Sequence, residues 1–137
     1  MTNHDDVRRI CAKLPGATEG EERFGFGVFV KGKHKGFCWT WAERVDPKKA
    51  KVINDGVLAV LVPNLTTKDL ILQSDSEKFF TEPHYNGYPA VLVRLAAIEP
   101  EELEDLLIEA WRCKAPKELL LQFHDGAGAS SAASKDA

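Results

Sequence analysis

The sequence lacks a hydrophobic run long enough to cross a membrane. A transmembrane helix needs about 20 consecutive apolar residues, and no stretch of the 137 residues comes near that length. The N-terminus is polar and carries Asp5 and Asp6, where a secretory leader has a basic and then an apolar segment. We therefore expect a cytoplasmic protein with no membrane contact.

Cysteine is scarce, and the number and spacing of the cysteines predict no disulfide bonds. The three cysteines are Cys11, Cys38 and Cys113, an odd number placed far apart, each within an apolar pattern. A disulfide framework needs an even and closely spaced set. The pattern instead predicts buried, reduced thiols, as in cytosolic proteins.

Motifs that carry catalysis or bind metals are missing as well. The four histidines are scattered, and none has a cysteine or carboxylate at metal-ligand spacing. Gly25, Gly27 and Gly32 lie in a strand pattern with no helix after it, so they do not form a phosphate-binding loop. Two pairs of adjacent glutamates lie in a connector and in the first turn of a helix, where solvation and the helix dipole account for them. We expect no catalytic residue, metal or cofactor.

Four helices are predicted from apolar spacing and from residues that begin and end helices. Asn3 caps the first helix, and Thr66 with Asp69 forms the start of the second. The sequence predicts helices over Asp5 to Leu14, Thr67 to Ser74, Pro100 to before Pro116, and Lys117 to Phe123. The domain covers residues 1–124, and a disordered tail rich in Gly, Ala and Ser covers residues 125–137.

Alternating or continuous apolar residues predict the strands. A short basic turn, Gly32 to Gly36, joins the first two strands into a hairpin, and a polar connector from Glu43 to Asp55 leads to the third. The expected strands cover Phe24 to Lys31, Phe37 to Ala42, Val57 to Val62 and Ala90 to Leu95, with Phe79 and Phe80 leading to the last one. The order of elements predicts an α+β fold: two layers, with a mainly antiparallel sheet of four to five strands and helices packed on one face.

The segment from Phe79 to Leu95 contains an unusual turn. Asn86-Gly87 favours a tight hairpin, but Pro83 and Pro89 flank it and remove two backbone donors. The strands therefore pair below the tip, which presents four side chains on a stiff projection suited to recognition: His84, Tyr85, Asn86 and Tyr88. In the alternative interpretation, the two tyrosines fold back as a lid over the core.

A basic cluster with aromatic neighbours is the remaining feature. It consists of Lys31, Lys33, His34 and Lys35 at the hairpin and Lys48, Lys49 and Lys51 in the connector. The net charge is −3, so binding to nucleic acid requires these residues to gather on one face and contact phosphates there. In the alternative interpretation, the lysines serve solubility and prevent edge pairing.

The order and spacing of several segments resemble the MmcQ/YjbR family, over nearly the whole chain to about residue 124. These segments are Leu14-Pro15-Gly16-Ala17-Thr18-Glu19, Phe26 to Lys31, Gly36 to Trp41, Phe79 to Val93 and Glu102 to Pro116. The resemblance implies a bacterial, cytoplasmic, CyaY-like α+β domain that binds DNA through a double-wing arrangement of hairpins. In this sequence the wings would be Gly32 to Gly36 and Pro83 to Pro89.

Three hypotheses follow. The first is a non-enzymatic protein that binds DNA weakly through the basic cluster, with His84, Tyr85, Asn86 and Tyr88 in the second wing. The second is a protein-interaction or adaptor domain, monomeric or homodimeric, that uses the aromatic projection and the sheet surface. The third is a small-molecule enzyme, which would need a deep polar pocket lined by His84, Tyr85 and buried carboxylates.

Overall fold

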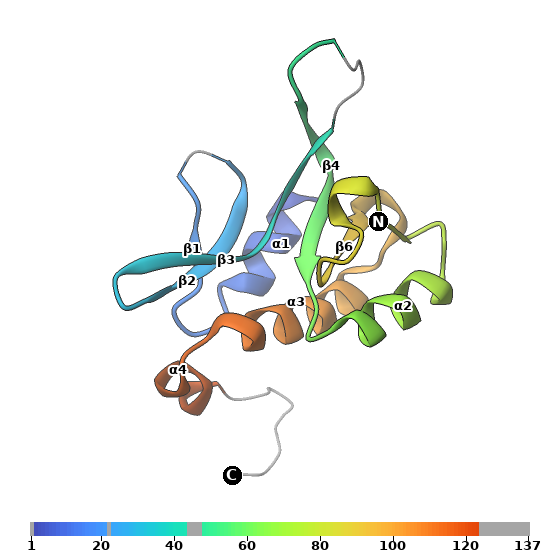
Figure 1. The fold of residues 1–137 in the computed structure, drawn as a ribbon. Helices are drawn as coiled ribbons and strands as arrows, with labels where there is room; N and C mark the ends of the chain where they lie inside the picture. The colour runs from blue at the N-terminus through green and yellow to red at the C-terminus, as the bar shows by residue number, and fades with distance from the viewer. Residues whose placement is uncertain (1, 22, 44–47, 124–137) are drawn as a thin grey trace.

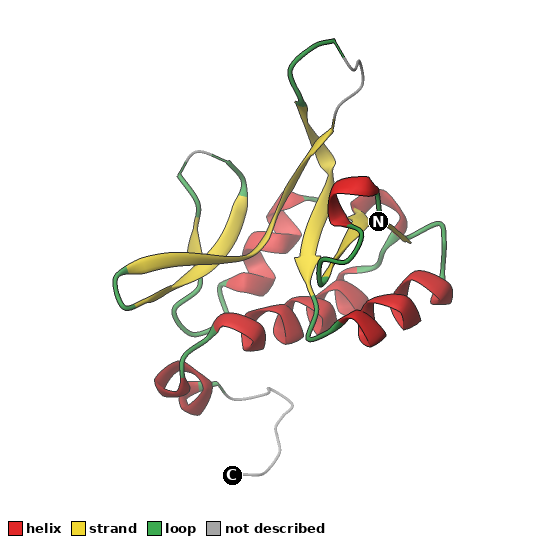
Figure 2. Ribbon diagram, viewed as in Figure 1, coloured by secondary structure: helices red, strands yellow, loops and turns green. Residues whose placement is uncertain are grey.

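The computed structural model describes residues 2–21, 23–43 and 48–123. The predicted disordered tail, residues 125–137, lies outside the described residues. Helices and strands follow one another as shown in Figure 2. In chain order they are α1 (His4–Cys11), β1 (Thr18–Glu19), β2 (Gly25–Val30), β3 (Lys33–Glu43), β4 (Val52–Leu61), α2 (Leu65–Ser74), β5 (Phe79–Phe80), the 3-10 turn η1 (Pro83–Tyr85), β6 (Ala90–Arg94), the 3-10 turn η2 (Leu95–Ala97), α3 (Pro100–Lys114) and α4 (Lys117–Gln122).

The sheet has six strands in the order β1-β2-β3-β4-β6-β5, and every neighbouring pair is antiparallel. The predicted antiparallel α+β fold is confirmed, but the predicted count of four to five strands is too low. The difference lies at the two edges of the sheet, where β1 and β5 have only two residues each. Segments this short show no periodicity in a sequence.

Helices α1 and α3 cover one face of the sheet (Figure 1). Val7 and Ile10 of α1 and Leu107 and Trp111 of α3 are fully or almost fully buried in one core cluster with the inward side chains of the strands. The Trp111 indole also donates a hydrogen bond to the Pro15 carbonyl, 2.9 Å away, which ties α3 to the segment after α1. Among the described residues, no helix combines the length and the apolar character that crossing a membrane requires.

The helix ends follow local capping rules. The Asn3 side chain accepts a hydrogen bond from the Asp6 backbone, and the Asp6 side chain accepts one from the Asn3 backbone, as predicted for a capped α1. The predicted cap of α2 at Thr66 is wrong, because Asn64 takes that role and accepts from Thr67 N at 2.8 Å. Helix α1 also ends at Cys11 and not at Leu14.

A bulge in β3 decides which side chains face the core. Phe26 pairs with Cys38 and Gly27 with Gly36, so Phe37 is an extra residue on β3. Phe37 and Cys38 are consequently both buried in the core. The period-two pattern instead placed Phe37 on the same face as the two tryptophans that follow it.

Strand β4 begins earlier than predicted. The segment expected to be a polar connector up to Asp55 already pairs with β3 from Val52 onward. The register shifts between Thr40 and Trp41, whose partners are Leu58 and Asn54. The Asn54 side chain accepts a hydrogen bond from Gly56 N at 2.9 Å, so this sequence forms a bulge within a strand and does not end the strand.

The cysteines are only partly as predicted. Cys11 and Cys38 are buried, and a hydrogen bond with the Cys38 thiol, together with burial, raises the pKa of the Cys11 thiol far above its ordinary value. Cys113 is exposed on the last turn of α3, so its predicted burial is wrong. All three are free thiols.

Candidate functional site

The first candidate surface is the hairpin formed by β2 and β3, here called the first ribbon (residues 28–35). Val30 pairs with Lys33, and the turn between them consists of Lys31 (φ +52°) and Gly32 (φ +80°). Positive φ at both central residues is typical of a type I′ turn. The predicted turn, Gly32 to Gly36, is therefore wrong, because residues 33–36 already belong to β3.

The lysines of the first ribbon are available for binding. Lys31, Lys33 and Lys35 are all exposed. Within the part of the chain that the structure describes, none of them has a carboxylate within ion-pair distance. His34 has a structural partner, because its Nε2 lies 3.2 Å from the Thr18 carbonyl oxygen and its ring packs edge-on against Phe29.

The second candidate surface is a two-stranded extension of the sheet, here called the second ribbon (residues 41–43 paired with 52–54, together with residues 48–51, which lead into the second of these strands). Figure 1 shows that it projects from the body of the domain in a different direction from the first ribbon. Lys48, Lys49 and Lys51 are exposed and lie directly before β4. The predicted basic cluster is thus divided between two ribbons that leave opposite ends of β3.

The predicted second wing, Pro83 to Pro89, folds back over the sheet. As predicted, its flanking strands pair below it, Phe79 with Val93 and Phe80 with Leu92. The segment between them, here called the covering loop (residues 82–89), places Tyr85 in contact with the sheet, so the lid interpretation is right for this residue. The other three predicted side chains, His84, Asn86 and Tyr88, are exposed.

A buried lysine holds the covering loop in place. The Lys68 ammonium donates hydrogen bonds to the carbonyl oxygens of Tyr85 and of Tyr88, the latter at 2.8 Å. Lys68 is 3% exposed, and its burial lowers the pKa of this side chain below 10.5. The sequence did not reveal this role, because the partners are 17 and 20 residues away.

Beneath and beside the covering loop lies the sheet face that α1 and α3 leave open. Trp39, Ala59, Leu92 and Phe80 are successive cross-strand partners on β3, β4, β6 and β5, so they form one row across this face. We define the aromatic face as the partly exposed Trp39, Trp41, Phe80 and Tyr85 above the buried Val57, Ala59 and Leu92.

Specific contacts fix the rings of the aromatic face. The Trp39 indole donates a hydrogen bond to the Tyr85 hydroxyl at 3.0 Å. Trp41 meets Phe80 edge-on, with ring centroids 5.4 Å apart. The exposed Arg94 guanidinium lies 4.1 Å from the centre of the Phe80 ring. The sequence did show that Trp39 and Trp41 share a face, but not that this face is open.

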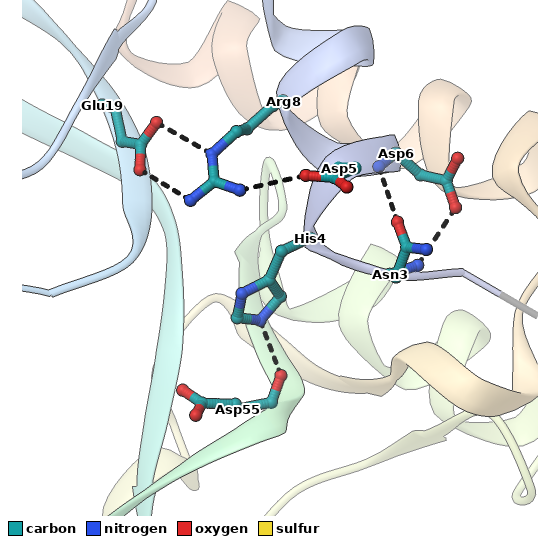
Figure 3. Close-up of polar contacts among 7 residues, drawn as sticks. All are labelled: Asn3, His4, Asp5, Asp6, Arg8, Glu19 and Asp55. Atoms are coloured by element: carbon teal, nitrogen blue, oxygen red, sulfur yellow. Dashed lines mark hydrogen bonds and ion pairs between the residues drawn. The ribbon is translucent and has the colours of Figure 1, made fainter.

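Histidines and carboxylates near the N-terminus have structural partners (Figure 3). Arg8 donates to both carboxylate oxygens of Glu19 at 3.2 Å, and His4 Nε2 lies 2.7 Å from the Asp55 carbonyl oxygen. A hydrogen bond from the Asn3 backbone lowers the pKa of Asp6. The described residues contain no group of three or more His, Cys, Asp or Glu side chains able to hold a metal ion.

A hollow of about 510 Å³ lies beside β1 and β2. It includes Glu19, Arg23 and His34, and each of these side chains already has a partner: Arg8, the Thr40 carbonyl and the Thr18 carbonyl, respectively. Among the described residues that line this hollow, no nucleophile has a base beside it.

Comparison with known proteins gives relatives and a fold. No family model matches the sequence. The uncharacterized protein Rv2570 of Mycobacterium tuberculosis and the uncharacterized protein Mb2600 of Mycobacterium bovis are each 33% identical over 129 residues, which is 93% of this chain and 100% of the relative. The crystal structure of the Deinococcus radiodurans protein DR2400, with a DUF419 domain, matches with a TM-score of 0.57 and 23% identity, covering 80% of this chain and 76% of that one. The two proteins share a fold.

Proposed function

This chain belongs to the family of the uncharacterized mycobacterial protein Rv2570, and we propose that it is a non-enzymatic, cytoplasmic domain of the MmcQ/YjbR type that binds DNA through its two basic ribbons. The common fold with the DUF419 protein DR2400 supports the MmcQ/YjbR assignment. The mycobacterial relatives support a bacterial protein.

The observation that carries this proposal is the placement of lysines on two projecting ribbons. The chain has a net charge of −3, so an approaching phosphate backbone is attracted only where positive charge is concentrated. The first ribbon provides Lys31, Lys33 and Lys35 without carboxylate partners in the described part of the chain. Each phosphate that such a lysine neutralises makes the affinity more sensitive to salt.

The test is the salt dependence of DNA binding, measured by fluorescence anisotropy with labelled DNA at low and near-physiological salt. The variant K33E/K35E should weaken binding and reduce the slope of log affinity against log salt by about 2, since each lost phosphate contact removes about 0.9. The matched control is Lys117→Glu, because Lys117 is an exposed lysine on α4, away from both ribbons. Unchanged binding by K33E/K35E would remove the first ribbon from the proposal.

A second candidate function, protein interaction without nucleic acid, is favoured by the exposed aromatic side chain on the covering loop. Tyr88 is 44% exposed and meets Tyr85 edge-on, with ring centroids 6.2 Å apart. Tyr88→Ala should reduce partner capture or dimerisation at unchanged stability, whereas Tyr85→Ala should also destabilise the domain because Tyr85 packs on the sheet. Light scattering and thermal unfolding of both variants would distinguish these effects.

A further inference from the structure

We propose that the DNA bound by this protein is single-stranded, and that its unpaired bases stack on the aromatic face. This inference rests on the proposed function, because the ribbon lysines supply the phosphate contacts. It adds the class of nucleic acid and the surface that recognises it.

The first argument is the shape of the aromatic face. Trp39 and Phe80 lie in one row across the sheet, and Tyr85 packs on Ala59 and Leu92 between them. Trp41 lies next to this row and in edge contact with Phe80, whose ring lies under the Arg94 guanidinium. Partly exposed aromatic rings and guanidinium planes on an antiparallel sheet offer platforms for unpaired bases, whereas the bases of a duplex are already stacked on one another.

The second argument is the positive charge beside the aromatic rings. The exposed Arg94 guanidinium lies 4.1 Å from the centre of the Phe80 ring, so this face carries a positive charge of its own. Lys48, Lys49 and Lys51 follow Trp41 in the chain and lie directly before β4. Lys33 and Lys35 pair with Val30 and the buried Val28, so they lie on the opposite face of the sheet from the tryptophans.

The third argument is rigidity. Lys68 holds the covering loop, the covering loop positions Tyr85, and Tyr85 accepts the hydrogen bond of the Trp39 indole. The Arg94 guanidinium donates to the Ser76 carbonyl at 3.1 Å, which keeps it above Phe80. Groups already held in one geometry lose little conformational freedom when a ligand binds.

The experiment compares labelled dT12 with a 12-base-pair duplex at low salt, by anisotropy and by tryptophan emission. We expect dT12 to bind at least about tenfold more tightly than the duplex and to quench the emission. Trp41→Ala should weaken dT12 binding by about five- to 150-fold, the usual effect of losing one stacking ring, and leave duplex binding unchanged. Trp41→Phe keeps a stacking ring and should retain most of the affinity, which separates stacking from misfolding.

The matched control is Ile53→Ala. Ile53 is a 44% exposed apolar residue on the same ribbon; it pairs with Ala42, next to the pair formed by Trp41 and Asn54, and so faces the other side. It should bind dT12 like the wild type. An oligouridylate of the same length shows whether the protein recognises unpaired bases of any nucleic acid or those of DNA in particular.

The outcomes separate the two proposals. Equal binding of dT12 and duplex, with Trp41→Ala unchanged, would overturn the stacking inference and leave DNA binding by the ribbons in place. Absence of binding to either probe at low salt would overturn both. A concentration-dependent doubling of molar mass that Trp41→Ala abolishes would assign the aromatic face to a second copy of this chain and would also overturn the inference.

Discussion

Replacing the buried Lys68 by methionine tests how the covering loop is held. Methionine has a similar length and an apolar end, so it fills the site but cannot donate to the carbonyl oxygens of Tyr85 and Tyr88. A buried carbonyl that loses its donor costs about 1–3 kcal/mol. Tyr88 itself is 44% exposed, so water can reach part of this loop, and we take the low end of that range for each carbonyl.

We therefore expect Lys68→Met to lower the free energy of unfolding by about 2 kcal/mol at pH 7. With an m-value of about 1.5 kcal/mol per M, the urea midpoint falls by about 1.3 M. Urea unfolding followed by tryptophan emission measures this change, because Trp39 is bonded to the covering loop through Tyr85. The control is Lys117→Met, which removes an exposed lysine and should leave the midpoint within about 0.3 M.

The pH dependence of the stability difference between the wild type and Lys68→Met gives a second check of the role of Lys68. Burial lowers the pKa of Lys68 in the folded protein below its ordinary value of 10.5. Between the folded pKa and 10.5 the unfolded chain binds more protons, so the contribution of Lys68 to stability rises with pH in that window. The stability advantage of the wild type over Lys68→Met should therefore be larger at pH 10 than at pH 7. A variant as stable as the wild type at pH 7, or an advantage that shrinks with pH, would refute this account of the loop.

Changes at four positions test the fold. Gly27→Ala should prevent folding or strongly destabilise the sheet, because the added Cβ would clash with the Lys35 carbonyl oxygen. Gly32→Ala should cost only about 1 kcal/mol, because the site has open space and only its φ of +80° is unfavourable. Equal thermal stability of the two variants would contradict this difference between the two glycines. Leu107→Ala should lower the unfolding free energy by about 2–5 kcal/mol in urea, because Leu107 is fully buried; a loss below 1 kcal/mol would mean that the core collapses around it. Asn64→Ala should cost about 1 kcal/mol and expose the start of α2 to hydrogen exchange, whereas Asn64→Asp should not.

The parts of the fold that the sequence predicts well depend on local patterns. The apolar stripe after Pro100 predicts a helix that ends before Pro116, and α3 is observed over Pro100–Lys114. The alternation around Phe26 gives the core face of β2. The second ribbon was missed because Asn54-Asp55-Gly56 is typical of a turn, and only pairing with β3 shows that it is a bulge.

The candidate site depends on contacts that no local pattern contains. The aromatic residues between Phe79 and Tyr88 attracted notice in the sequence, but their geometry is set by Lys68 from α2 and Trp39 from β3. Hydrogen bonds of this range follow from the tertiary fold. The lysines were recognisable as a cluster, but their division between two ribbons depends on how far β3 extends beyond its neighbours on each side.

The two register shifts on β3 limit how the length of this protein can change in evolution. Removing Thr40, which lies between the two shifts, would turn Trp41 toward the helices, because successive side chains alternate in direction; removing the extra residue Phe37 would only restore regular pairing at the bulge. A residue inserted at the turn of the first ribbon leaves that alternation intact. We expect related sequences to differ in length at the turn and to keep a constant number of residues between the two shifts.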